Sequence, residues 1–440
     1  MATGSSPTIA RVPADFMQNP YEILETFRDQ GPVHEVVFAH GAKVWLVTRY
    51  EEIRALVSDP RVSKDGRRMN ELFARHSGEP VEEGDDSAGV GFDDDLATHM
   101  LNSDPPRHTR LRTLVSKAFT GQRVERLRPR VEQVADVLLD GFARPSPVDL
   151  VSEFAVRLPI TIICDLFGIP DRDREDFRLW GTKLVGAGQD PAEVADASTR
   201  VVDYASALIE SKRADPGDDM VSALVRVTDE GDRLTHGELV SMIFFLVVAG
   251  HITTIYSIGN AVYNLLTHPG ELAKLRADRS LIPAAVDELM RYDPAAAVGT
   301  FRFTTDEIRV GDVVIPPDQI LALSWSSANR DSSHFPDADR LDLHRHPLGS
   351  MAFGHGIHYC LGVPLAKMQI EVALTRLITR FPDLRLAVDP KQLRWENNAL
   401  LRGLVALPVS VSPGAEESRP APTEPDPAPT SGGSGSRRTS

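Results

Sequence analysis

The sequence predicts a predominantly α-helical protein with a small β region, and three observations support this fold class. Apolar residues recur at helical spacing in residues 131–142, 151–167 and 239–266. Strand signals are short and few: residues 43–48 follow the turn-forming pair His40-Gly41, and 308–310 and 313–315 flank Gly311-Asp312 as in a hairpin. The composition, with 42% apolar and 25% charged residues among 440, is that of a folded globular protein.

We divide the chain into an N-terminal extension (1–14), one large domain (15–411) and a C-terminal tail (412–440). The tail is rich in Pro, Glu, Ser and Gly and cannot bury enough apolar surface to offset its ordering entropy, so we expect it to be disordered. A second loop-like stretch, residues 82–95, carries many acidic side chains. No stretch between these has the composition of an interdomain linker.

Charge and cysteine content exclude several classes of protein. The net charge of −15 disfavours a nucleic-acid binder or a protein attached to anionic membranes. Cys164 and Cys360 are the only cysteines, which rules out a disulfide scaffold and suits a reducing cytoplasm. The first residues have neither a long apolar run nor a basic leading segment, so we expect no secretory signal.

One long apolar helix is predicted in the second half of the domain. Thr235 and Glu238 have the spacing of a capping box, and the helix they open extends to about Thr267, before Pro269. Its length would admit a membrane span. Several small and polar residues interrupt its middle, namely Gly250, His251, Thr253, Thr254, Ser257, Gly259 and Asn260. Polar groups in mid-membrane are costly, so we predict a core helix that borders a ligand cavity.

The sharpest chemical signal is a ten-residue run around the second cysteine. It reads Phe353-Gly354-His355-Gly356-Ile357-His358-Tyr359-Cys360-Leu361-Gly362. Its first two glycines allow a tight turn and close approach of the backbone to a flat ligand. Cys360 then stands at the start of a predicted helix, residues 361–379, whose N-terminal dipole favours a thiolate. A thiolate so placed is a strong electron-donating ligand for haem iron.

Two other interpretations of Cys360 stay open from the residues alone. A lone cysteine is commonly a buried core residue. His355, His358 and Cys360 could also bind zinc, although structural zinc sites take four ligands and no second ligand pair occurs nearby.

This run resembles the haem-binding loop of the cytochromes P450, whose pattern Phe-Gly-x-Gly-x-(His/Arg)-x-Cys-x-Gly it matches at every defined position. The resemblance covers about residues 15–413 and is greatest to bacterial soluble members that tailor macrolides and polyketides. It implies a mainly α fold with haem b between a long central helix and the helix after the cysteine. It also implies that Cys360 is the axial iron ligand and that Phe353 and Gly354 contact the haem.

Further motifs agree with this resemblance. Glu288-Leu-Met-Arg291 matches the family's Glu-x-x-Arg motif, and Arg340 falls where the family places the arginine that completes a buried ion-pair network. The resemblance assigns this network a structural role beneath the haem. It also implies four residues that bind the haem propionates: His108 and Arg112, which are i and i+4 on one predicted helix, together with Arg302 and His358.

The long helix carries the family's oxygen-activation pattern with one departure. Members have Ala-Gly-x-(Asp/Glu)-Thr, which here reads Ala249-Gly250-His251-Ile252-Thr253. The resemblance assigns catalysis to Ala249, Gly250 and Thr253, but the acid that relays protons is replaced by Ile252, which has no titratable group. His251 precedes the acid's position and is expected on another face of the helix. Three outcomes are open. Protons could come from a water chain or from a hydroxyl of the substrate. Alternatively, the consumption of reductant could be poorly coupled to product formation, or peroxide could be the oxidant.

The resemblance also implies partners and a substrate class. The substrate is expected to be a hydrophobic small molecule, a secondary metabolite that is hydroxylated or epoxidised. Small side chains in residues 295–300 indicate room for a bulky ligand, and the acidic loop 82–95 is more plausibly solvated than a substrate contact. Electrons would come from NAD(P)H through ferredoxin reductase and ferredoxin. Residues 107–130 hold eight basic residues against Glu125 alone and are the candidate docking region.

We expect a cytoplasmic monomer with no nucleic-acid or membrane partner. A haem-binding ligand sensor without turnover is the alternative from a different class of function. Substrate-dependent oxygen consumption distinguishes the two.

Overall fold

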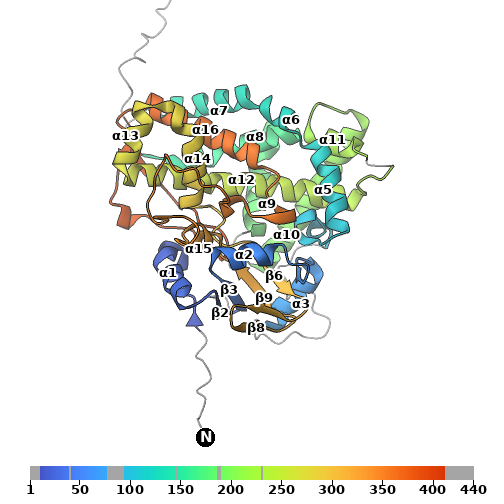
Figure 1. Ribbon diagram of the computed structural model, residues 1–440. Coiled ribbons are helices and arrows are strands. Elements are labelled where there is room, and N and C mark those ends of the chain that lie inside the picture. The colour runs from blue at the N-terminus through green and yellow to red at the C-terminus, as the bar shows by residue number, and fades with distance from the viewer. Residues whose placement is uncertain are drawn as a thin grey trace, which may run out of the picture.

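The computed structural model describes residues 10–38, 41–76, 94–143, 147–185, 190–228 and 231–411. A helical part and a smaller part built on β-sheet lie against one another, at the top and bottom of Figure 1. The predicted disordered tail (412–440), most of the N-terminal extension and the acidic loop up to residue 93 lie outside the described residues.

Helices form most of the described chain, which confirms the predicted fold class. They are α1 (Pro20–Gln30), α2 (Tyr50–Val57), α3 (Gly66–His76), α4 (Asp94–Ala97), α5 (Arg107–Ala118), α6 (Gly121–Glu125), α7 (Arg128–Asp140), α8 (Arg157–Phe167), α9 (Arg174–Val185), α10 (Pro191–Ala214), α11 (Met220–Arg226), α12 (His236–Thr267), α13 (Pro269–Ala277), α14 (Ile282–Tyr292), α15 (Trp325–Asn329) and α16 (Val363–Arg380). The stretch predicted as one helix, 151–167, begins as a π-helical turn (Val151–Ala155) and continues as α8.

Three small sheets make up the β region. The strands are β1 (Ala10–Arg11), β2 (Val33–Val37), β3 (Lys43–Val47), β4 (Val62–Ser63), β5 (Val148–Asp149), β6 (Arg302–Thr304), β7 (Ile308–Val310), β8 (Val313–Ile315), β9 (Ile320–Leu323), β10 (Arg385–Leu386) and β11 (Pro408–Ser410). The largest sheet has the order β1-β2-β3-β9-β6-β4. β7 and β8 form the predicted hairpin, and Gly311 in its turn has φ 59°, a left-handed conformation that favours glycine.

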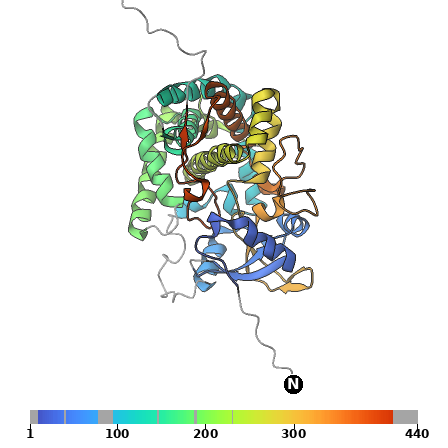
Figure 2. The ribbon, with the colours of Figure 1, turned by 90° about the vertical axis from the view of Figure 1, so that its left-hand side faces the viewer.

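Helix α12 runs through the middle of the helical part and is seen almost end-on in Figure 2, surrounded by other helices. It begins with the predicted capping box: Thr235 Oγ1 accepts from the N–H of Glu238, and the Glu238 carboxylate accepts from the N–H of Thr235. Within the described ranges it alone is long and apolar enough to cross a membrane. Its place among the other helices shows a core helix, as predicted.

The largest sheet brings distant segments of the chain to one edge of the helical part. β4 pairs antiparallel with β6, so that Ser63 lies opposite Phe303. Residues 64 and 302 thereby become neighbours although 238 positions separate them. This pairing places a side chain from the N-terminal part of the chain beside the site described next.

Candidate active site

The cysteine loop folds into a tight turn before α16. Gly354 and Gly356 have φ of 72° and 69°, so both glycines occupy the left-handed region that the sequence pattern predicted. The N–H of Cys360 donates to the carbonyl of Phe353 at 3.0 Å and closes the loop. Helix α16 begins at Val363, two residues later than predicted, with Pro364 in its first turn.

Cys360 faces a cavity, and its surroundings act on the thiol in opposite directions. Burial among protein atoms raises the pKa of the Cys360 thiol, while hydrogen bonds from the N–H groups of Gly362 and Val363 and the charge of Arg112 lower it. Burial is the larger effect, so the helix N-terminus alone does not hold a thiolate here. A bound metal cation deprotonates a coordinating thiol directly.

The cavity measures about 320 Å³ and lies between the cysteine loop and α12. Most of its surface is apolar, as in many small-molecule sites. Its walls include Leu101, Phe167, Phe245, Leu246, Ala249, Gly250, Thr253, Val298, Phe353, Gly354, Cys360, Leu400 and Leu401. The predicted catalytic residues of α12 and the predicted iron ligand therefore line the same cavity.

On α12, Thr253 and its two small neighbours form one wall. The Thr253 hydroxyl donates to the carbonyl of Ala249 at 2.8 Å and keeps its acceptor capacity. A Cβ at Gly250 would lie 2.9 Å from Cδ1 of Ile163, so glycine here also lets α8 pack closely against α12. Ala249 is exposed to the cavity.

The two residues between Gly250 and Thr253 do not line the cavity. Ile252 is buried in the helical core. His251 is also buried: its Nδ1 lies 2.7 Å from the carbonyl of Val247, and burial lowers its pKa to about 4. His251 thus points to another face of the helix, as predicted, and stays neutral near pH 7.

Arginine and histidine side chains gather at the edge of the cavity, where the sequence predicted propionate contacts. Arg112 donates from Nη2 to the carbonyl of Tyr359 at 2.6 Å. The rings of His108 and His358 lie 4.3 Å apart, centroid to centroid. Arg302 is buried at the start of β6, and burial lowers its pKa to about 10. The structure therefore brings all four predicted propionate residues together.

These surroundings fit the two carboxylates and the flat ring of a haem. Neither ring nitrogen of buried His108 has a hydrogen-bond partner within the described residues. Buried polar atoms normally have partners, so His108 has capacity for a group that the protein itself does not supply. The free Cys360 faces the mainly apolar cavity that α12 also lines, and Arg112 and Arg302 lie at the edge of that cavity. His, Cys, Asp and Glu form no metal-binding group of three or more in the part of the chain that the structure describes, which disfavours the zinc interpretation.

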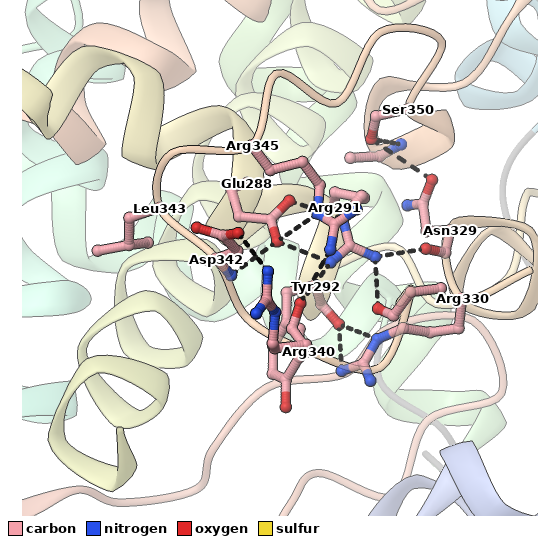
Figure 3. Close-up of polar contacts among 12 residues, drawn as sticks. Glu288, Arg291, Tyr292, Asn329, Arg330, Arg340, Asp342, Leu343, Arg345 and Ser350 are labelled. Carbon is pink, nitrogen blue, oxygen red and sulfur yellow. Dashed lines mark hydrogen bonds and ion pairs between the residues drawn. The ribbon is translucent and has the colours of Figure 1, made fainter. Parts of the chain in front are cut away.

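The buried ion-pair network beside the loop differs from the prediction in one member (Figure 3). Glu288 and Arg291 are fully buried and form a bidentate pair with N–O distances of 2.7 and 2.8 Å. The third cation is Arg345, whose Nε lies 3.1 Å from Glu288 Oε1. The predicted residue, Arg340, has a 65% exposed side chain that pairs with Asp342 instead. Its backbone carbonyl faces Arg291 at 3.3 Å, which directs its side chain outward.

This network is connected to the cysteine loop through one asparagine. Arg291 Nη1 donates to the backbone carbonyl of Asn329 at 2.7 Å. The side-chain oxygen of Asn329 in turn accepts a hydrogen bond of 2.7 Å from the N–H of Met351, in the turn before Gly354. Figure 3 labels Asn329 and Ser350, the residue that precedes Met351. The contacts agree with the structural role expected for Glu288 and Arg291.

The basic stretch 107–130 is less positively charged in the fold than in the sequence. Acids from elsewhere in the chain pair with several of its arginines. The pairs are Arg110 with Asp232 and Glu238, Arg123 and Arg126 with Asp218, Arg128 with Glu371, and Arg130 with Asp165. The excess of positive charge in the sequence is therefore largely compensated.

Comparisons with known proteins agree with this geometry. The family model described as cytochrome P450 matches residues 188–408. Cytochrome P450 107B1 of Saccharopolyspora erythraea is 46% identical over 94% of this chain and 100% of its own length. The 6-deoxyerythronolide B hydroxylase of the same organism is 42% identical over 88% of this chain and 95% of its own. The tirandamycin C-bound P450 monooxygenase TamI superposes with a TM-score of 0.82 at 43% identity, covering 92% of this chain and all of that one.

The chain therefore belongs to the cytochrome P450 family, as its cysteine loop predicted. It is a P450 monooxygenase whose cofactor is haem with a cysteine thiolate as axial ligand. Its high-coverage relatives are bacterial enzymes that tailor macrolides and polyketides.

Two residues of the site were not found from the sequence. Arg345 lies five positions beyond Arg340, and nothing local distinguishes the two arginines. Lys64 follows β4 and lies in no motif, yet it is buried beside Arg302. Only the pairing of β4 with β6 reveals its position.

Proposed function

We propose that this P450 hydroxylates or epoxidises a hydrophobic secondary metabolite of the polyketide or macrolide type in the cytoplasm, with electrons from NAD(P)H delivered through ferredoxin reductase and ferredoxin. The observation that carries the proposal is one cavity that both Cys360 and Thr253 line and that is otherwise mainly apolar. When bound, haem supplies the activation of O2 and the transfer of one oxygen atom to a C–H or C=C bond. Cys360 would hold it from below, and His108, Arg112, Arg302 and His358 would bind its propionates.

The residues of α12 that line the cavity would position oxygen and protons at the haem. Ala249 leaves space there, and the Thr253 hydroxyl can accept a hydrogen bond in the cavity while it donates to Ala249. Ile252 supplies no proton. Thr254 and Ser257 also border the cavity, and with Thr253 they can support a chain of water molecules. This favours proton delivery through water over delivery through a carboxylate.

The substrate class is supported by the relatives and by the cavity wall. A hydroxylase of 6-deoxyerythronolide B and a P450 that binds tirandamycin C are close in sequence and length. Residues 295, 296 and 298–300 border the cavity, as expected. Gly299 is small for a further reason, because a Cβ there would lie 2.4 Å from the ring of Trp325.

For electron delivery, the surface around the cysteine loop is a better candidate than the whole basic stretch. Leu348 is 84% exposed, and Ile357 and Tyr359 are also exposed. Exposed Arg107 begins the helix α5, whose residues His108 and Arg112 approach this loop. An apolar patch with a cationic rim suits a small acidic protein. Raised ionic strength is expected to slow electron transfer only modestly, because most arginines of 107–130 already have acidic partners.

The test is turnover with purified components. Candidate macrolides and polyketides are first screened for a shift of the Soret band, and those that shift it are incubated with NAD(P)H, ferredoxin reductase and ferredoxin under ¹⁸O2. We expect a product that gains one labelled oxygen atom. Binding without any oxygenated product under these conditions would favour the alternative of a ligand sensor.

A second candidate, peroxide-driven oxygenation, is favoured by Ile252 in place of the usual acid. Hydrogen peroxide brings its own protons, so the missing relay would not limit it. Product formation with peroxide that equals or exceeds the rate with NAD(P)H and redox proteins would make this the main activity. A rate well below that of the redox-protein system would reject it.

A further inference from the structure

Lys64 is a buried lysine whose backbone is held by the pairing of β4 with β6 and by Asp104. It follows β4, its side chain is almost entirely buried, and its backbone N–H donates to Asp104 Oδ1 at 3.0 Å. The same carboxylate accepts a hydrogen bond from the hydroxyl of Ser63. Asp104 also precedes α5, and its carbonyl accepts from the N–H of His108 at 2.9 Å. Lys64 is thereby held against the helix that carries His108 and Arg112.

The ammonium group of Lys64 points toward the predicted propionate residues. Nζ donates to Thr300 Oγ1, and Thr300 lines the cavity. The positive charge of Lys64 lowers the pKa of His99, His108 and His358, so all three rings are within electrostatic reach of it. The positive charge of Arg302 likewise lowers the pKa of Lys64. The lysine therefore stands among cations and neutral histidines.

Negative charge is scarce around this group. Burial lowers the pKa of Lys64 well below its ordinary value, and within the described ranges Asp104 is the acid that opposes this effect. Asp104 already accepts hydrogen bonds from Ser63 and from the backbone of Lys64. Arg302 is buried as well, and Asp104 is again the acid that acts on it. Two buried cations thus share one carboxylate, and a buried charge without a full partner is costly.

We propose that Lys64 is a further cationic partner of a haem propionate, in addition to His108, Arg112, Arg302 and His358. The haem carboxylates supply the negative charge that this edge of the cavity lacks. The contact with Thr300 shows that the ammonium group reaches this edge of the cavity. Lys64 is in this sense a binding residue for the cofactor, contributed by the N-terminal sheet.

The test measures how firmly the holoenzyme retains haem. Lys64→Met removes the charge and keeps most of the volume, and haem transfer to excess apomyoglobin is followed by absorbance. We expect transfer roughly tenfold faster than from the unmodified protein, the scale of one lost charge-assisted hydrogen bond. Lys64→Arg should restore most of the retention. Lys391→Met, at an exposed lysine, should leave the transfer rate unchanged.

Two further measurements separate cofactor binding from a structural role. Loss of a positive charge beside a propionate should lower the Fe(III)/Fe(II) midpoint potential of Lys64→Met, which a packing defect alone would not do. Thr300→Val removes the contact to the lysine but keeps the ammonium group, so its haem transfer rate should stay near that of the unmodified protein. The proposal is overturned if Lys64→Met keeps the normal transfer rate and potential, or if Thr300→Val accelerates transfer as much as Lys64→Met does.

Discussion

At the scale of single residues, Ile252 is the departure that bears most directly on the proposed route of protons. It is buried in the core of the helical part and does not line the cavity, although it occupies the acid's place in the family pattern. Thr253, Thr254 and Ser257 are the hydroxyl-bearing residues of α12 that do line it. This agrees with the proposed delivery of protons through water that these hydroxyls would order.

Replacing Ile252 by glutamate should improve coupling and reduce stability. A carboxyl group at this position restores a titratable relay, so more product should form per NAD(P)H consumed. The same change buries a polar group in apolar surroundings, at a cost of about 1–3 kcal/mol. Product and NAD(P)H are quantified together, and thermal unfolding is measured in parallel. Tight coupling in the unmodified enzyme would contradict this account of Ile252, and Ile252→Gln serves as the control for shape without a proton.

The two arginines at 340 and 345 provide a matched pair of variants. Arg345→Met should lower the free energy of unfolding by about 2 kcal/mol, because a charged hydrogen bond to buried Glu288 is lost. Arg340→Met should change it by less than about 0.5 kcal/mol, because that side chain is exposed. Denaturant unfolding of the holoenzymes checks both values. Equal losses would mean that Arg340 has a role its exposed side chain does not explain.

Residue-scale prediction from sequence placed residues together correctly where their arrangement depends on neighbours along the chain. Gly354, Gly356 and Cys360 belong to one loop, and His108 and Arg112 to one helix, so their arrangement is local. Arg345 pairs with Glu288, which lies 57 positions earlier in the chain. Lys64 comes to lie beside Arg302, 238 positions later, through the pairing of β4 with β6. No pattern within a short window contains that information.

At the scale of elements, α12 is the best predicted feature of the fold. Its capping box and apolar run define a helix whose observed bounds are His236–Thr267. The stretch 151–167 was less well predicted, because the π-helical turn at Val151–Ala155 has no clear sequence signal; this turn and α8 both pack against α12. The pairing of acids with the arginines of 107–130 could not be predicted from the sequence either, because those acids come from other helices and loops.

Removing the cap of α12 should weaken the whole fold measurably. Thr235→Ala eliminates the hydroxyl that accepts from Glu238 N–H, with an expected loss of about 1 kcal/mol in the free energy of unfolding. Thr199→Ala, in the exposed middle of α10, should cost nothing or stabilise slightly, because alanine is the better helix former there. Chemical denaturation of both variants provides the comparison. A loss for Thr199→Ala as large as for Thr235→Ala would argue against a capping effect.

At the scale of the whole molecule, buried neutral histidines should make stability depend on pH. Burial lowers the pKa of His99 to about 3 and that of His251 to about 4, below the ordinary value of 6.5. Between pH 6.5 and these lowered values, the unfolded chain therefore binds more protons than the native protein. The stability of the native protein falls as the pH decreases through this range. Each histidine contributes roughly 1.4 kcal/mol per pH unit below its ordinary pKa.

This pH effect can be measured by denaturant unfolding of the holoenzyme between pH 7 and pH 5. His251→Asn keeps the capacity to donate to Val247 but does not titrate, so its stability should decline less steeply with acid. His236→Asn, at an exposed histidine, is the control and should keep the original slope. If His251→Asn has the same slope as the unmodified protein, His251 is not a source of the acid sensitivity.

The wide spacing of the propionate partners along the chain has a consequence for biosynthesis. Lys64 and His108 are synthesised early, Arg302 much later, and Cys360 after all of them. No early segment contains a complete set of haem contacts. The apoprotein must therefore be synthesised at least as far as the cysteine loop before it can present a complete haem site.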